Sequence, residues 1–156
     1  MKSSQRLAKE YSKIQKSDNE FNISIDSNNI LNWKAILKGP DETPFKNGNF
    51  EISIKCTDQY PMKPPKVFFN TPIFHPNIHF KTGEVCLDVL KANWSPAWDI
   101  FAICRAISLL LSHPEPDSPL NCDAGNMLRA KDEMAYFSMG EMYTQMFAIK
   151  ENSDKK

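Results

Sequence analysis

The sequence predicts an α+β fold built on one antiparallel sheet. Strand-like segments follow one another between about residues 21 and 69, and the connections between them are short. Strands joined in this way pair antiparallel, because a parallel crossover needs a dozen or more residues. The helical patterns lie before and after these strands, an arrangement typical of α+β proteins. A length of 156 residues fits one domain over 1–156, and we expect an ordered core over about 3–150.

Residues 3–16 are predicted to form the first helix. Leu7, Tyr11 and Ile14 recur at i, i+4 and i+7 and so lie on one apolar face. Basic side chains recur at steps of four and three on another face, where they form either a solvated surface or a docking surface for acidic partners. This basic stripe consists of Lys2, Arg6, Lys9, Lys13 and Lys16.

Alternating apolar and polar residues predict four strands, at 21–26, 32–38, 50–54 and 67–69. A turn is expected at residues 28–29. Residues 60–66 contain three prolines, so this segment can be neither a central strand nor a helix. We expect a stiff connector that holds Met62 at the surface.

The second half of the chain predicts three helices. Asp99 has the position of an N-cap for a central core helix that ends near residue 111. A proline-rich loop at 113–119 precedes a short helix near 123–130. Asp132 is expected to begin a last helix that reaches about Lys150, and the charged residues 151–156 are expected to fray.

Composition excludes several classes of function. Nineteen basic and 19 acidic side chains give no net charge, which argues against a nucleic-acid partner bound by bulk charge. No apolar run approaches 18 residues and no secretory signal is visible, so we expect a cytosolic protein. The four cysteines contain no Cys-x-x-Cys pair, and we predict no metal site. Cys56 and Cys104 are expected to be buried, inert thiols.

The segment 75–98 carries the predicted chemistry. It contains Cys86 and, nine residues upstream, the carboxamide of Asn77. A thiolate can attack an acyl group, and a nearby amide can stabilise the oxyanion that forms, so this pair suits acyl-thioester chemistry. Gly83 permits a sharp turn before the cysteine. A thiol hydrolase would also need a histidine base against the cysteine, and His75, His79 and His113 are the three histidines available.

This segment resembles the active site of ubiquitin-conjugating enzymes (E2s). It has their His-Pro-Asn tripeptide at 75–77, their Gly-x-Ile/Val-Cys-Leu run at 83–90 and their Trp-Ser-Pro-Ala element at 94–97. The resemblance implies that Cys86 is the nucleophile and that Asn77 serves the oxyanion or the loop. It implies structural roles for His75 and Pro76. By position, Ser118 matches the gate beside the cysteine, with Asp117 as a second candidate and Leu120 flanking it. The partner-contact positions are Arg6, Met62, Ser95, Pro96 and Ala97.

The resemblance also implies a fold and a reaction. The fold would be a first helix, a four-stranded meander, an active-site loop, a central helix and two C-terminal helices. Cys86 would accept ubiquitin as a thioester from the activating enzyme (E1) and pass it to an acceptor with a RING-type ligase (E3). No metal, nucleotide or other cofactor is implied. A non-catalytic E2-like module that binds ubiquitin remains an alternative, as does a thiol hydrolase.

The sequence departs from the usual family pattern in one spacing, and residues elsewhere resemble the peroxisomal branch of the family. The spacing from Asn77 to Cys86 is nine, one more than in most members, and the extra residue lies in 79–84. The residues at 98–99, 117–120, 125–126 and 129 also look most like that branch. The resemblance implies ubiquitination of the peroxisomal import receptor at the cytosolic face of the membrane, with a membrane-anchored partner. A general cytosolic E2 that modifies lysines of other substrates is the alternative, and the acceptor, lysine or cysteine, is left open.

Overall fold

The computed structural model describes residues 2–86 and 94–150, and it confirms the α+β prediction. The helices and strands, in chain order, are α1 (Ser3–Gln15), β1 (Ser24–Asp26), β2 (Asn29–Lys38), β3 (Asn49–Lys55), β4 (Lys66–Phe69), α3 (Ile100–Ser112), α4 (Cys122–Arg129) and α5 (Glu133–Phe147). No helix within the two described ranges is long and apolar enough to cross a membrane.

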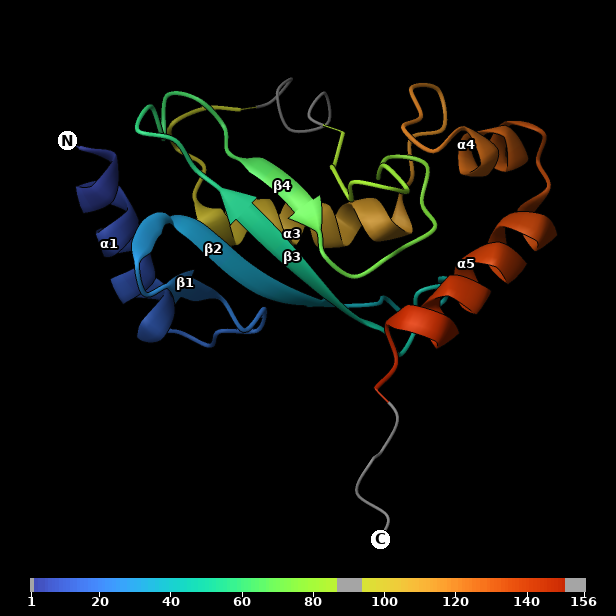
Figure 1. Ribbon diagram of the computed structural model, residues 1–156, viewed down its shortest axis with the longest axis horizontal. Helices are drawn as coiled ribbons and strands as arrows, with labels where there is room; N and C mark the ends of the chain where they lie inside the picture. Colours follow the sequence, from blue (N-terminus) through green and yellow to red (C-terminus); the bar gives the residue numbers. More distant parts are fainter. Residues whose placement is uncertain (1, 87–93, 151–156) are drawn as a thin grey trace, which may run out of the picture.

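The sheet is an antiparallel meander with the strand order β1-β2-β3-β4. Trp33 of β2 pairs with Ile54 of β3, which pairs in turn with Val67 of β4. All three are buried, because paired residues on neighbouring strands point to the same face of the sheet. Helix α3 covers this face with its own buried residues Ile103 and Ile107 (Figure 1).

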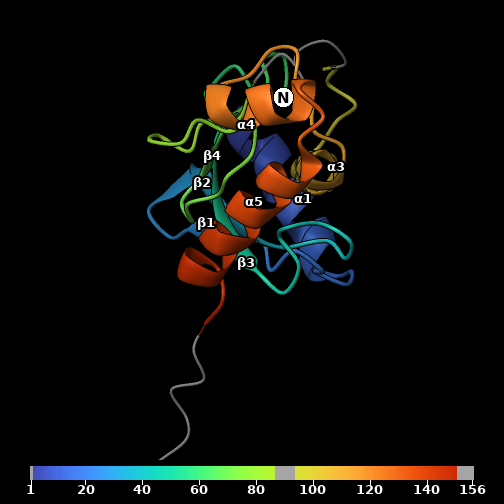
Figure 2. The same cartoon turned by 90° about the vertical axis from the view of Figure 1, so that its right-hand side faces the viewer.

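The remaining helices stand at the two ends of the sheet. Figure 1 shows α1 at one end and α4 and α5 at the other. Figure 2 looks along the molecule from the α5 end, with the strands on one side of the view and α3 on the other. The hairpin that precedes Cys86 lies against β4, an outer strand of the sheet, through the isolated bridge between Glu84 and Phe68.

Helix starts follow the predicted caps. The Asp99 side chain accepts a hydrogen bond from the Ala102 amide at 2.7 Å, and Asp132 accepts one from Ala135 at 3.1 Å. Each bond satisfies one of the amide groups left unpaired at a helix start, which typically contributes about 1 kcal/mol.

Several boundaries differ from the sequence-based prediction. The first strand begins at Ser24 rather than at residue 21, because Asn22 has a positive φ of 45° that interrupts the extended backbone. The second strand begins three residues early, at Asn29. The last helix ends at Phe147 rather than Lys150, and the carbonyl of the next residue, Ala148, accepts a hydrogen bond from Asn49 at the start of β3.

Candidate active site

His75 is an internal support of the site. Its side chain is fully buried, its Nε2 is 2.9 Å from the Leu110 carbonyl, and its Nδ1 accepts the Asn77 amide proton at 3.1 Å. This arrangement requires the neutral tautomer with the proton on Nε2. Burial lowers the pKa of His75 to about 4, against the smaller opposing effect of the Leu110 carbonyl. The ring therefore ties the tripeptide to α3 and stays neutral.

Asn77 joins the tripeptide to the proline-rich loop. Its Nδ2 donates to the Glu115 carbonyl and its Oδ1 accepts from the Glu115 amide, both at 2.8 Å. The side chain is fully buried. An amide nitrogen has two protons, so one N–H remains for another acceptor. The carboxamide thus braces the loop with both of its polar atoms, and one N–H group of Nδ2 makes no bond to this loop.

Cys86 is held by the backbone of the same tripeptide. Its amide donates to the Asn77 carbonyl at 2.8 Å, and Ile78 and Val85 form an isolated antiparallel bridge next to it. Gly83 turns this hairpin with a φ of 74°, and a Cβ there would lie 2.0 Å from the Phe69 carbonyl oxygen. The glycine that was predicted to make a sharp turn is therefore needed both for its backbone angle and for close packing on β4.

The gate residues lie in a loop that is fixed to Pro76. The Pro76 carbonyl accepts hydrogen bonds from the amides of Leu120 at 2.8 Å and Asn121 at 3.1 Å. Ser118 and Asp117, between this anchor and Glu115, have exposed side chains. The structure therefore brings the predicted nucleophile segment, the tripeptide and the gate loop together. Residues 87–93, which include the rest of the predicted cysteine run, lie outside the described residues.

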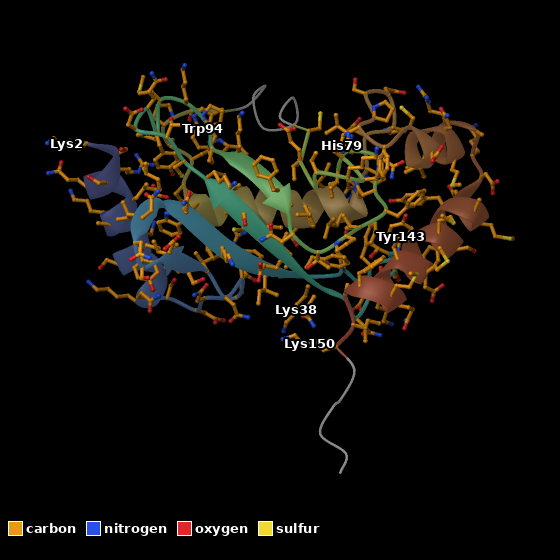
Figure 3. All side chains as sticks on the ribbon, viewed as in Figure 1. Lys2, Lys38, His79, Trp94, Tyr143 and Lys150 are labelled. Carbon is orange, nitrogen blue, oxygen red and sulfur yellow. The ribbon has the colours of Figure 1, made fainter. Side chains whose placement is uncertain are left out.

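The predicted partner-contact loops lie together at the α1 end. Met62 is 74% exposed, Pro96 and Ala97 are also exposed, and Ser95 is half-buried. Trp94 links the two loops, because its Nε1 donates to the Pro61 carbonyl at 2.9 Å. Figure 3 shows Trp94 toward α1 and His79, from the hairpin before Cys86, toward α4. The partner-contact loops and the cysteine hairpin are thus separate regions of one edge.

Arg6 is placed differently from the rest of the basic stripe. The four lysines of the stripe are exposed, but Arg6 donates from Nη2 to the carbonyls of Pro96 and Trp98, both at 2.9 Å. Its Nε donates to Glu10, which is 7% exposed. Sequence reasoning missed Glu10, although its position three residues after Leu7 placed it on the apolar face of α1.

Two of the other thiols, Cys56 and Cys104, are buried, and the histidines make hydrogen bonds to the backbone. Burial raises the pKa of Cys56 to about 12, helped by the charge of Glu10, and burial also raises the pKa of Cys104 to about 12. His79 accepts two backbone amide protons at its Nδ1, and His113 bonds a carbonyl of its own helix. Across 2–86 and 94–150, no histidine hydrogen-bonds to the Cys86 sulfur.

Similarity to known proteins extends over most of the chain. The family model for ubiquitin-conjugating enzymes matches residues 6–143. The chain belongs to this family. Protein PEROXIN-4 of Arabidopsis thaliana is 51% identical to this E2 over 147 residues, which cover 92% of the chain and 94% of the relative.

Further relatives confirm the resemblance to the peroxisomal branch. The ubiquitin-conjugating enzyme E2 pex4 of Dictyostelium discoideum is 49% identical over 144 residues, or 91% of this E2 and 97% of the relative. The crystal structure of the H. polymorpha enzyme Pex4p, in complex with the soluble domain of Pex22p, matches with a TM-score of 0.88 at 31% identity. That match covers 95% of this E2 and 99% of the solved chain.

The buried His75 predicts a specific loss of stability in acid. The unfolded chain takes up a proton on His75 below about pH 6.5, whereas the folded protein does so only near pH 4. The stabilisation is therefore complete above pH 6.5 and falls by about 3 kcal/mol as the pH drops to 4. Urea unfolding of the wild type and of His75→Gln at several pH values measures this difference.

The exposed His113 supplies the control. His113→Gln should keep the wild-type pH dependence, while His75→Gln should be less stable at pH 7.5 but lose less stability toward pH 4. Parallel curves for His75→Gln and the wild type would show that His75 does not stay neutral in the folded protein.

Proposed function

We propose that this E2 accepts ubiquitin from an activating enzyme as a thioester on Cys86 and transfers it to an acceptor together with a ligase. The observation that carries the proposal is the convergence of three segments, of which the gate loop is distant in sequence from the other two. The Cys86 amide bonds to Asn77, Asn77 bonds to Glu115, and Pro76 bonds to Leu120 and Asn121. The cysteine, the amide and the gate loop therefore act as one unit.

The reaction exchanges one acyl bond for another in each step. The Cys86 thiolate attacks the carbonyl carbon of the activating enzyme's thioester, and the thiolate of that enzyme leaves. The acceptor nucleophile then attacks the new thioester, loses its proton, and the Cys86 thiolate leaves. A thioester exchanged for a thioester needs little driving force, so the protein's contribution is proximity and stabilisation of the oxyanion.

Asn77 supplies the donor for that oxyanion in our proposal. One of its N–H groups is committed to Glu115, and that bond fixes the orientation of the second. A donor that is already oriented stabilises developing charge without reorganising during the reaction. The bracing contact and the catalytic role are therefore compatible in one side chain.

The peroxisomal relatives support a more specific role. Two relatives with about half of their residues identical carry peroxin-4 names, and the Pex4p structure contains the soluble domain of Pex22p. We infer that this E2 works at the cytosolic face of the peroxisomal membrane, where a membrane-anchored partner holds it. Its acceptor would be the peroxisomal import receptor, its ligase would be of the RING type, and Met62, Ser95, Pro96 and Ala97 would form the contact with that ligase.

The thioester is tested by changing the cysteine to an oxygen nucleophile. Cys86→Ser should form a ubiquitin oxyester that survives thiol reductant, because an alkoxide leaves less readily than a thiolate. The measurement is charging with E1, ATP and ubiquitin, followed on gels with and without reductant.

The exposed Cys122 offers a matched control. Cys122→Ser should charge like the wild type, with an adduct that reductant releases. Charging that persists in Cys86→Ala and disappears in Cys122→Ser would show that Cys122 carries the thioester and that the proposal for Cys86 is wrong.

Removing the Asn77 amide should affect both the reaction and stability. Asn77→Ala should slow discharge to an amine by about 10²–10³, the usual cost of one oxyanion donor. It also leaves the partly buried polar groups of Glu115 without partners, at about 1–3 kcal/mol each. Single-turnover discharge and urea unfolding measure the two effects separately. An unchanged discharge rate with a large loss of stability would leave Asn77 only its bracing role.

The gate position makes a prediction about the acceptor. A lysine amine has a pKa of about 10.4 and a thiol about 8.5, so an acceptor lysine depends more on a nearby base. Ser118 is a poor base, and we expect discharge to free cysteine to be fast and discharge to free lysine to be slow without ligase. Ser118→Asp should speed lysine discharge by about tenfold or more and leave cysteine discharge nearly unchanged.

The comparison needs two references. Ser138→Asp adds the same charge on the exposed side of α5 and should change neither rate, and a lysine-directed E2 under the same conditions supplies the reference for thiol reactivity. Fast lysine discharge by the wild type that Ser118→Asp does not alter would refute this account of the gate.

A further inference from the structure

Glu10 is the most buried charged side chain among the residues that the structure describes, and it takes no part in the proposed reaction. It lies in the middle of α1, where it contacts Arg6 of the same helix and two other segments. Both of its carboxylate oxygens accept the Tyr60 hydroxyl, at 3.0 and 2.8 Å. Its Oε1 also accepts the Ile100 amide at 2.7 Å, and its Oε2 accepts Nε of Arg6 at 3.0 Å. One carboxylate thus connects α1, the Met62 loop and the start of α3.

Arg6 extends this connection to the second partner-contact loop. Its Nη2 group donates to the carbonyls of Pro96 and Trp98, which bracket the turn that exposes Ala97. The guanidinium also stands 6.0 Å from the centre of the Tyr60 ring. The same turn is closed internally, because the Trp98 amide donates to the Ser95 carbonyl at 3.0 Å. Arg6, which the sequence placed among the partner-contact positions, therefore bonds to the backbone of the 95–98 loop.

Stability does not explain why a carboxylate occupies this place. Burial raises the pKa of Glu10, and the hydrogen bonds from Ile100, Tyr60 and Arg6 only partly oppose that effect. A buried ion pair gains little net stability over apolar residues of similar volume, because both charges lose their water. Such a pair does provide a defined geometry, because a carboxylate and a guanidinium fix the positions of several donors and acceptors at once.

We propose that Glu10 and Arg6 are positioning residues for ligase-stimulated transfer, and that they hold the Met62 loop and the 95–98 loop in one fixed relative arrangement. This inference rests on the proposed function in one respect, that these two loops contact the ligase. Met62 and Pro96 come from segments more than 30 residues apart. The Trp94–Pro61 hydrogen bond joins these segments once, and the shared anchor of Tyr60 and the Pro96 carbonyl joins them a second time and fixes their relative position. Glu10 touches neither ubiquitin nor acceptor in this role.

Two conservative variants test the role. In Glu10→Gln, the remaining oxygen can still accept from Ile100 and Tyr60, but an NH2 group now faces the Arg6 Nε donor. Tyr60→Phe removes only the hydroxyl and keeps the ring that packs beside Trp94. Glu141→Gln, on the exposed side of α5, makes the same charge change away from both loops and serves as the control.

The readout is discharge of the charged E2 as a function of ligase concentration. Both variants should need about five- to tenfold more ligase for half-maximal stimulation, with E1 charging, unstimulated discharge and the saturated rate within about twofold of the wild type. The backbone amide resonances of Met62 and Ala97 should shift in both. A purely structural defect would instead lower all rates together, and an unchanged ligase dependence in Tyr60→Phe would overturn the inference even if Glu10→Gln failed to fold.

Met62→Ala separates this inference from the proposed function. If Met62→Ala does not weaken ligase stimulation, then the ligase does not use this surface, and the proposed contact is wrong. If Met62→Ala weakens it while Tyr60→Phe and Glu10→Gln do not, then the surface is right and the positioning role is wrong.

Discussion

The pair of hydrogen bonds between the Asn77 carboxamide and the backbone of Glu115 is the constraint on which the site depends. These bonds join two segments separated by 38 residues, and both are 2.8 Å long. Pro76 adds two more bonds to the same loop, and the Cys86 amide bonds back to Asn77. The cysteine and the gate loop are therefore positioned by one buried tripeptide, which His75 in turn fixes to the central helix.

The gate loop and the 95–98 loop are stabilised in the same way. In each case a polar side chain, fully buried for Asn77 and half-buried for Arg6, satisfies backbone groups of a loop that has no regular secondary structure. Asn77 does so for the gate loop, and Arg6, supported by Glu10, does so for the loop at 95–98. Because loops made in this way stay stiff without being part of the sheet, they can present exposed residues such as Ser118 and Ala97 in fixed positions.

Sequence patterns predicted the elements well where the cause was local. The strands followed the alternation of Trp33, Ala35 and Leu37, and the helices followed caps such as Asp99. The first strand was predicted to begin too early. The positive φ of Asn22 interrupts the extended backbone, and it leaves no clear signal in the alternation of apolar and polar residues. The roles of Arg6 and Asn77 needed tertiary information, since their partners lie far away in the chain. Glu10 was detectable in principle, as a charge on an apolar helix face.

Native-state hydrogen exchange of the wild type tests the central claim most directly, through the amides of Glu115, Leu120 and Asn121. Glu115 lies in the proline-rich loop, and Leu120 and Asn121 follow it directly, but each of the three amides donates to Pro76 or to Asn77. We expect them to be protected about as strongly as amides of α3, and we expect Asn77→Ala to abolish the protection at Glu115 while the amides of β2 and β3 stay protected. Exchange of these three amides in the wild type at the rate of an open loop would contradict the account.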